Sequence, residues 1–325
     1  MTALDNGYYL DSFLAPLAPM LSRSDVTDIW INRPGEVWIE SLGGGVERLL
    51  EPKLDEKALA RLAKQIAAHS SQGISRAQPL LAAKLPDGSR VQVVAPPATR
   101  DGHSFAIRRH VSANVSLADW EEAGAFDDAK SGDTAIAEDR AFRSLAGREA
   151  ASWLREAVRT RKNILVSGGT STGKTTFLNS LLAEVPLDER LVLIEDTAEL
   201  RLIHQNAVGL IAARGELSEA DVTAEDLLIA ALRMRPDRII LGELRGTEAF
   251  TFLRAVNTGH PGSMTTIHAD TPQRAVEQMA LLVLQAGSKL ARDDVRHYVY
   301  ESVDGFVQLE RRAGKRRISQ IMCAE

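Results

Sequence analysis

The chain has 325 residues, which is enough for two domains that each bury a core of their own. With 44% hydrophobic and 26% charged residues it is typical of a globular protein, and its formal net charge of -5 argues against a protein that coats nucleic acid by bulk electrostatics. The single cysteine, Cys323, excludes a disulfide framework and a multi-cysteine zinc site within one chain, and it favours a reducing compartment.

The N-terminal stretch carries no secretion signal, because Asp5 and Asp11 stand where a signal peptide has basic residues. No apolar run approaches the ~20 residues that span a bilayer, so we expect any membrane contact to be peripheral. Apolar residues between 9 and 21 share one helical face, which Pro16 and Pro19 interrupt. This helix has no basic face beside it, so we expect it to pack on its own domain rather than on lipid.

Residues 1–110 are predicted to form a small α+β domain. The segment 26–40 contains two β-rich runs around a turn at 32–35, which indicates a hairpin with Trp30 and Trp38 in the core or on the sheet face. Asp55 precedes a run with helical periodicity, and strands are expected at 90–94 and 104–109. Strands combined with a helix in this way are typical of an α+β domain.

Residues 111–148 are predicted to be an acidic inter-domain linker with short helices, since apolar runs are broken there. From 149 to 325, strands and helices alternate. Strands are expected at 164–167, 191–194, 239–241 and 264–267, and helices at 153–158, 174–183, 225–234 and 248–256. Near-continuous apolar strands predict a mostly parallel sheet with helices on both faces. A C-terminal hairpin has a basic tip at 311–317, either solvated or in contact with an anionic partner.

The segment 168–175 has the full P-loop spacing of a nucleoside triphosphate site. Glycines at its ends allow backbone N–H groups to point at phosphate oxygens, the Lys174 ammonium can reach the β- and γ-phosphates, and the Thr175 hydroxyl can ligate Mg²⁺. A glycine-rich turn that binds nothing is the alternative. The predicted nucleotide-binding residues are Gly168, Gly169, Thr170, Ser171, Thr172, Gly173, Lys174, Thr175 and Thr176.

Carboxylates and a histidine follow other predicted strands at the edge where open α/β sheets bind ligands. Glu243 follows the strand 239–241 and is a candidate for polarising the attacking water. Glu195, Asp196 and Glu199 follow the strand 191–194, and they position metal or water unless they are helix caps. His268 follows the strand 264–267 and is a candidate sensor of the γ-phosphate, although a lone histidine is usually structural.

Four ordered segments resemble the boxes of the type II/IV secretion ATPase superfamily: GGTSTGKTT the P-loop, IEDTAEL the acidic box, RMRPDRIILGELRG the second Walker motif and TGHPGSMTTIHAD the histidine box. VTDIWINRPGEVWIE and PLLAAKLPDGSRVQVVAPP resemble, more narrowly, the hexameric traffic ATPases of type IV secretion and conjugation systems. The resemblance implies a RecA-like C-terminal domain, a PAS-like N-terminal domain and a homohexameric ring that uses ATP and Mg²⁺. It also implies inner-membrane secretion partners and a cytoplasmic location at the face of that membrane.

The same resemblance implies that Arg90 and Arg108 belong to the nucleotide site, so that ATP would close the cleft between the domains. The alternative is that Arg90 pairs with Asp87 and that Arg108 is a surface residue. The zinc module of type II secretion relatives needs four cysteines, and this chain has only Cys323.

The sequence therefore predicts a motor in which ATP hydrolysis drives pilus assembly or substrate transfer. A nucleic-acid motor on the same core would need basic loops rich in aromatic residues, whereas aromatic residues make up only 5% of this chain, and single-stranded DNA would have to stimulate its ATPase. We expect no sequence-specific nucleic-acid binding. A nucleotide-gated scaffold without turnover is disfavoured by Glu243.

Overall fold

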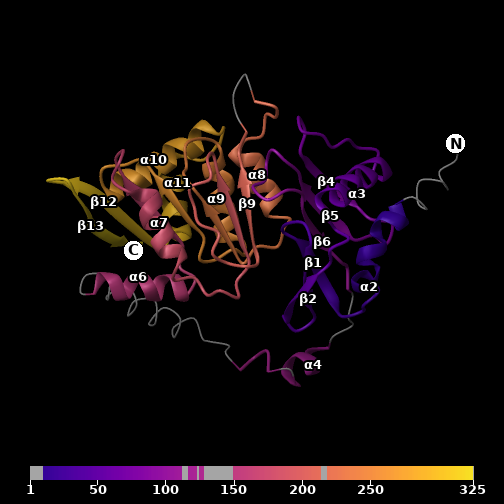
Figure 1. Ribbon diagram of the computed structural model, residues 1–325. Coiled ribbons are helices and arrows are strands. Elements are labelled where there is room, and N and C mark those ends of the chain that lie inside the picture. Colours follow the sequence, from indigo (N-terminus) through magenta and orange to yellow (C-terminus); the bar gives the residue numbers. More distant parts are fainter. Residues whose placement is uncertain (1–9, 112–115, 123, 128–148, 214–217, 325) are drawn as a thin grey trace.

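The computed structural model describes residues 10–111, 116–122, 124–127, 149–213 and 218–324, and two β-sheets organise it (Figure 1). Most of the predicted linker lies outside the described residues, apart from a short helix, α4 (Leu117–Glu122). The domain boundaries at 110 and 149 therefore stay a prediction. Residue 9, which we placed on the apolar face of the N-terminal helix, also lies outside the described part.

The N-terminal sheet is antiparallel throughout and has the strand order β3-β2-β1-β6-β5-β4. Its strands are β1 (Val26–Ile31), β2 (Glu36–Ser41), β3 (Val46–Leu50), β4 (Leu80–Lys84), β5 (Arg90–Val94) and β6 (Ser104–Arg108). The predicted hairpin is confirmed, with Trp30 directly opposite Trp38. The sequence interpretation missed β3 and β4, and it extended β6 by one residue.

Helices cover one face of this sheet. The helix α3 (Glu56–His69) begins where predicted, because the Asp55 carboxylate accepts a hydrogen bond from the Ala58 N–H at 2.7 Å. The short helices η1 (Ala15–Leu17) and α2 (Ala18–Leu21) follow the N-terminal segment, whose Leu10 is fully buried in the same apolar cluster as α3. The expectation that the N-terminal segment packs on its own domain is confirmed for the described residues.

The C-terminal sheet has the order β13-β12-β7-β11-β10-β8-β9, and all of its pairings are parallel except that of the edge strand β13. Its strands are β7 (Ile164–Gly168), β8 (Leu191–Glu195), β9 (Ala207–Ile211), β10 (Arg238–Leu241), β11 (Met264–Ile267), β12 (Gly305–Arg312) and β13 (Lys315–Cys323). The four predicted strands and the C-terminal hairpin are present. The strand β9 is an addition to the prediction.

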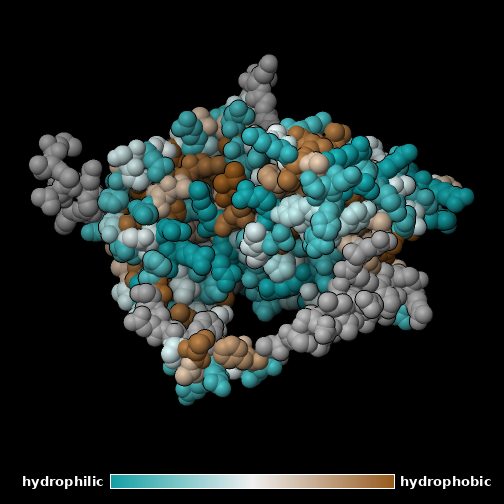
Figure 2. All heavy atoms as spheres, turned by 180° about the vertical axis from the view of Figure 1, so that it is seen from behind, coloured by the Kyte–Doolittle hydropathy of each residue, from teal (hydrophilic) through white to brown (hydrophobic). Residues whose placement is uncertain are grey.

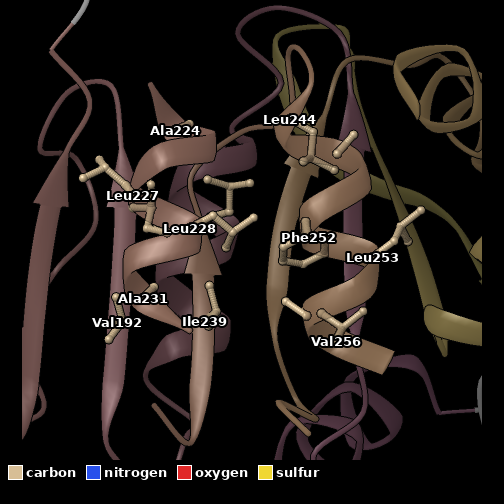
Figure 3. Close-up of a cluster of buried hydrophobic side chains, with 14 of the residues drawn as sticks. Val192, Ala224, Leu227, Leu228, Ala231, Ile239, Leu244, Phe252, Leu253 and Val256 are labelled. Atoms are coloured by element: carbon tan, nitrogen blue, oxygen red, sulfur yellow. The ribbon is translucent and has the colours of Figure 1, made fainter. Parts of the chain in front are cut away.

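Helices lie on both faces of this sheet, as predicted. The side chain of Leu165 packs with the helices α8 to α11, whereas its neighbours Ile164 and Val166 pack with α6 and α7. Figure 3 shows Leu227, Leu228, Phe252 and Leu253 on α8 and α9, the two helices that lie over the strands carrying Val192 and Ile239. The helices are α6 (Ala150–Arg159), α7 (Lys174–Leu182), α8 (Ala224–Ala231), α9 (Glu248–Asn257), α10 (Pro272–Gln285) and α11 (Arg292–Ser302). Near-continuous apolar residues along the parallel strands, buried on both faces, produce this three-layer arrangement.

The uncovered face of the N-terminal sheet packs on the C-terminal domain, so Trp30 is 2% exposed and belongs to the same apolar cluster as α8 and α9. Backbone hydrogen bonds also join the domains, from the Arg100 N–H to the Gly209 carbonyl and from the Ile211 N–H to the Ala98 carbonyl, both at 3.0 Å. They cover the otherwise free edge of β9. Figure 2 shows the outer surface from behind, where hydrophilic residues dominate and hydrophobic ones gather in smaller patches.

Candidate nucleotide-binding and catalytic site

The P-loop joins the buried strand β7 to the first turn of α7. Gly173 is the N-cap of that helix with φ +94°, a left-handed conformation that glycine adopts without a steric penalty. Gly168 is required for a different reason, because a Cβ there would lie 2.5 Å from Thr172 Oγ1 and 3.0 Å from the Leu309 carbonyl oxygen. The loop therefore needs glycine at both ends, and the N-terminus of α7 opens toward the carboxyl edge of the sheet.

A cavity of about 510 Å³ opens at this edge. Parallel strands bring their carboxyl ends together, so β7, β8, β10 and β11 each deliver residues to it. The predicted site residues that line it are Thr170, Ser171, Gly173, Lys174, Thr175, Thr176, Glu195, Asp196, Glu199, Glu243 and His268. Gly168, Gly169 and Thr172 hold the loop from behind: the Thr172 hydroxyl donates to the Gly169 carbonyl at 2.8 Å.

The Lys174 ammonium is half-buried against its own loop. Its Nζ donates to the carbonyl oxygens of Gly168 at 3.0 Å and Gly169 at 3.3 Å, and it lies 3.2 Å from His268 Nδ1. Burial lowers the pKa of Lys174, and the nearby Glu243 carboxylate opposes this shift. The ammonium is thus held at the loop by weak backbone acceptors that a phosphate group can replace.

Glu243 contacts both the histidine and an arginine. Its Oε1 lies 2.7 Å from His268 Nε2, and its Oε2 accepts a hydrogen bond from Arg245 Nε at 2.8 Å. Arg245 also donates to Asp196 at 3.0 Å, and the hydrogen bond with Glu243 is the main reason why the pKa of Arg245 is raised. The imidazole thus lies between the Lys174 ammonium on its Nδ1 side and the Glu243 carboxylate on its Nε2 side, in ion-pair distance of the latter but without the geometry of a hydrogen bond. His268 therefore lies in contact with both the P-loop lysine and the carboxylate expected to polarise water.

Comparison with known proteins agrees with this geometry. A family model described as "Type II/IV secretion system protein" matches residues 12–314. This chain belongs to that family. The type IV secretion system protein VirB11 of Bartonella quintana (strain Toulouse) is 38% identical over 324 residues, or 95% of this chain and 91% of the relative. The PtlH homolog of Bordetella bronchiseptica is 38% identical over 331 residues, or 98% of this chain and 96% of the relative.

A solved structure supports the same assignment at the level of the fold. The crystal structure of the VirB11 ATPase from the Brucella suis type IV secretion system, in complex with sulphate, is similar with a TM-score of 0.88 at 35% identity. The similarity covers 99% of this chain and 96% of that one, so both sheets take part in it. Among the residues that the structure describes, no helix is long and apolar enough to cross a membrane.

Glu195 lines the cavity but is bonded to backbone and inter-domain partners, and its role in positioning metal or water stays a prediction. Its Oε1 accepts hydrogen bonds from the backbone N–H groups of Glu199 at 2.9 Å and Leu200 at 2.7 Å, and its Oε2 is in an ion pair with Arg100 of the N-terminal domain. The carboxylate is buried, and both backbone hydrogen bonds go to its Oε1. Glu195 thus holds the turn after β8 and the domain contact, while Asp196 and Glu199 stay exposed at the cavity.

Arg90 and Arg108 do not reach the P-loop cavity of their own chain. They lie opposite each other on β5 and β6, and both line a second cavity of about 990 Å³, to which Arg233 at the end of α8 also contributes. The alternative pairing with Asp87 is not seen either, because the Asp87 carboxylate accepts hydrogen bonds from the backbone and hydroxyl of Ser89. A nucleotide role for these arginines within one chain is therefore not supported, and a role toward another subunit stays a prediction.

Three arginines near the site were missed by sequence reasoning. Arg245 follows Glu243 by two residues, a spacing that was available as a signal. Arg316 lines the cavity from the C-terminal hairpin, where the basic tip was interpreted mainly as solvated charge. Arg100 reaches Glu195 from the other domain, and no local sequence pattern marks it.

Proposed function

We propose that this chain hydrolyses ATP to ADP and phosphate as a subunit of a secretion motor, and that it powers pilus assembly or substrate transfer in a type IV secretion or conjugation system. The single observation that carries this proposal is the contact series from Lys174 through His268 to Glu243 inside one P-loop cavity. A phosphate-binding cation beside a carboxylate at the end of an apolar strand is the arrangement that a nucleotide hydrolase requires.

The roles follow from the contacts. Lys174 binds the terminal phosphates by exchanging its backbone acceptors for phosphate oxygens, and this exchange also loosens its contact with His268. Glu243 orients the attacking water, because the loosened imidazole leaves its Oε1 available while the exposed Arg245 holds its Oε2. His268 thereby reports to Glu243 whether phosphate is present. This coupling supports the predicted sensor role of His268.

The residues present fit a magnesium ion that enters with the nucleotide. Within the described residues, no three His, Cys, Asp or Glu side chains cluster in a way that could hold a metal, so the ion depends on phosphate oxygens and the Thr175 hydroxyl. When bound, Mg²⁺ supplies neutralisation of phosphate charge. Asp196 and Glu199 are near enough to the cavity to hold water around such an ion.

The subunit interface is proposed to complete the site. Arg90 and Arg108 carry no ion pair within the described part of the chain and lie away from their own P-loop, and they remain available to a neighbouring subunit of a homohexamer. The domains of one chain share buried contacts, so movement driven by ATP is proposed between subunits rather than within one. Attachment to inner-membrane secretion partners at the cytoplasmic face belongs to the same proposal.

The decisive experiment compares two variants. Lys174→Ala should lose ATP binding and hydrolysis together, whereas Glu243→Gln should bind ATP with hydrolysis reduced by ~10² or more. Glu184→Gln, which neutralises a surface carboxylate beyond the end of α7, is the matched control and should behave like the wild type. Hydrolysis at the wild-type rate in Glu243→Gln would remove this residue from the catalytic role.

Two further measurements address the ring. Light scattering with ATP and Mg²⁺ should give a mass near six copies of the 35.4 kDa chain. Mixing Arg108→Ala with Lys174→Ala subunits should restore some activity, because an interface that joins the P-loop of an Arg108→Ala subunit to the arginine of a Lys174→Ala subunit is intact. An active monomer would contradict the motor, and no recovery in the mixture would place the arginines outside a shared site.

A further inference from the structure

Arg316 lies in the P-loop cavity although it is distant from the loop in sequence. It comes from β13, the antiparallel edge strand, and lines the cavity together with Gly173, Lys174 and Thr175. A Cβ built on Gly173 would lie 2.9 Å from Arg316 Cδ and 3.1 Å from its Nε. Gly173 therefore serves two purposes, since it starts α7 with a positive φ and leaves room for the arginine chain against the loop.

The charge pattern of the hairpin indicates that Arg316 lies in a position suited to bind an anion. Arg316 lies directly opposite Arg311, and the next pair toward the turn is Arg312 opposite Lys315. Like charges that face each other across a strand pair are destabilising. None of these four side chains forms an ion pair in the part of the chain that the structure describes. An anion in the adjoining cavity would offset this repulsion.

The sheet order decides which end of a nucleotide faces Arg316. The strand β7, which carries the P-loop, has β11 and β10 on one side and β12 and β13 on the other. His268 and Glu243 follow β11 and β10, so the γ-phosphate belongs on that side. Arg316 lies on the opposite side of the P-loop, where the α-phosphate and the nucleoside must be.

We propose that Arg316 is a nucleotide-binding residue of its own chain, and that its guanidinium pairs with the phosphate oxygens shared by ATP and ADP at the end of the cavity away from Glu243. The planar, multi-donor guanidinium suits this task better than an ammonium group. This inference rests on the proposed ATPase function. It assigns to the C-terminal hairpin a part in holding the nucleotide, separate from the hydrolytic step.

The test is a direct titration with fluorescent analogues of ADP and of non-hydrolysable ATP, in parallel with steady-state ATPase kinetics. Arg316→Ala should weaken the binding of both nucleotides by about tenfold or more, the contribution of one charge-assisted hydrogen bond. The turnover number at saturating ATP should stay within about twofold, because Arg316 does not face the reacting phosphate. Arg316→Lys should recover only part of the affinity. Arg317→Ala removes the neighbouring charge from the other side of the strand and should bind like the wild type.

The outcomes separate this inference from the proposed function. If Lys174→Ala loses binding while Arg316→Ala binds both nucleotides like the wild type, the role of Arg316 is wrong and the ATPase proposal stands. If Arg316→Ala binds only the ATP analogue more weakly, the placement of Arg316 at the phosphates shared by ATP and ADP is wrong. If the wild type itself binds neither nucleotide, both proposals fail. Unchanged circular dichroism confirms that each variant is folded.

Discussion

Arg190 offers the sharpest test of how the two domains are joined. It lies just before β8, is 1% exposed, and stands between the N-terminal sheet and the C-terminal domain. Its Nη1 donates to Asn32 Oδ1 at 2.7 Å and to Asn206 Oδ1 at 2.6 Å, and its Nε donates to the Met234 carbonyl at 3.1 Å. The guanidinium carbon is 4.6 Å from the centre of the Trp30 ring. Burial lowers the pKa of Arg190 to about 9, so the group remains charged at neutral pH.

The variant Arg190→Met retains much of the side-chain volume and removes every donor. The Asn32 Oδ1 and the Met234 carbonyl oxygen are then buried without these donors, and each lost donor lowers the stability by about 1–3 kcal/mol. Asn206 Oδ1 retains a hydrogen bond from Asn32 Nδ2 at 3.0 Å. Losing the cation–π contact with Trp30 adds about 2 kcal/mol to this loss of stability. Part of the total loss is offset, because the variant no longer buries a charge. We expect a net loss of about 3 kcal/mol in the free energy of unfolding.

The assay is urea unfolding followed by tryptophan fluorescence, to which the buried Trp30 contributes. The matched control is Arg76→Met, since Arg76 also bonds across the domains, to the Glu219 carboxylate at 2.7 Å, but the side chains of both residues are more than 60% exposed. The control should lose less than about 1 kcal/mol. A loss in Arg190→Met no larger than that of the control would show that the buried network does not stabilise the domain contact.

Three other variants test the interior and its charges. Burial raises the pKa of Asp28, so its charged form is disfavoured in the folded state. Asp28→Asn should therefore be more stable than the wild type at pH 7. This difference in stability should disappear below about pH 4, where Asp28 is protonated in both the folded and the unfolded state. Gly305→Ala should cost about 1–3 kcal/mol in thermal unfolding, because its Cβ would lie 2.5 Å from the Trp153 ring. Gln308→Leu should cost about 1–3 kcal/mol, since it removes the nearer acceptor of the buried Ser167 hydroxyl, at 2.5 Å, and leaves it the Val307 carbonyl at 3.4 Å.

Each of these expectations has an outcome that contradicts it. A stability difference between Asp28→Asn and the wild type that is independent of pH would show that the carboxylate charge is not the cause. Gly73→Ala, at a position with open space around it, is the control for Gly305→Ala, and equal losses in the two would rule out the ring clash. Unchanged unfolding of Gln308→Leu would mean that the Ser167 hydroxyl finds another acceptor.

The sequence alone determined the fold class and the central part of the site. The P-loop residues, from Gly168 to Thr176, are contiguous, and their geometry follows from local glycine conformations and the start of α7. Glu243 and His268 were placed by strand periodicity, because residues that follow parallel strands must meet at one edge. Each of these inferences needed only short-range information.

Only the tertiary structure decided which residues from distant parts of the sequence lie at the carboxyl edge of the C-terminal sheet. Arg316 reaches the P-loop because β13 pairs with β12 and β12 with β7, and Arg100 reaches Glu195 because the N-terminal domain packs against β9. Such contacts depend on sheet order and domain packing, which leave no periodic trace in the sequence. For the same reason Arg90 and Arg108, which we predicted to lie beside the nucleotide, line another cavity of their own chain. The buried hydrogen bonds of Arg190 fix the orientation of the two domains, and this orientation holds both arginines away from the P-loop.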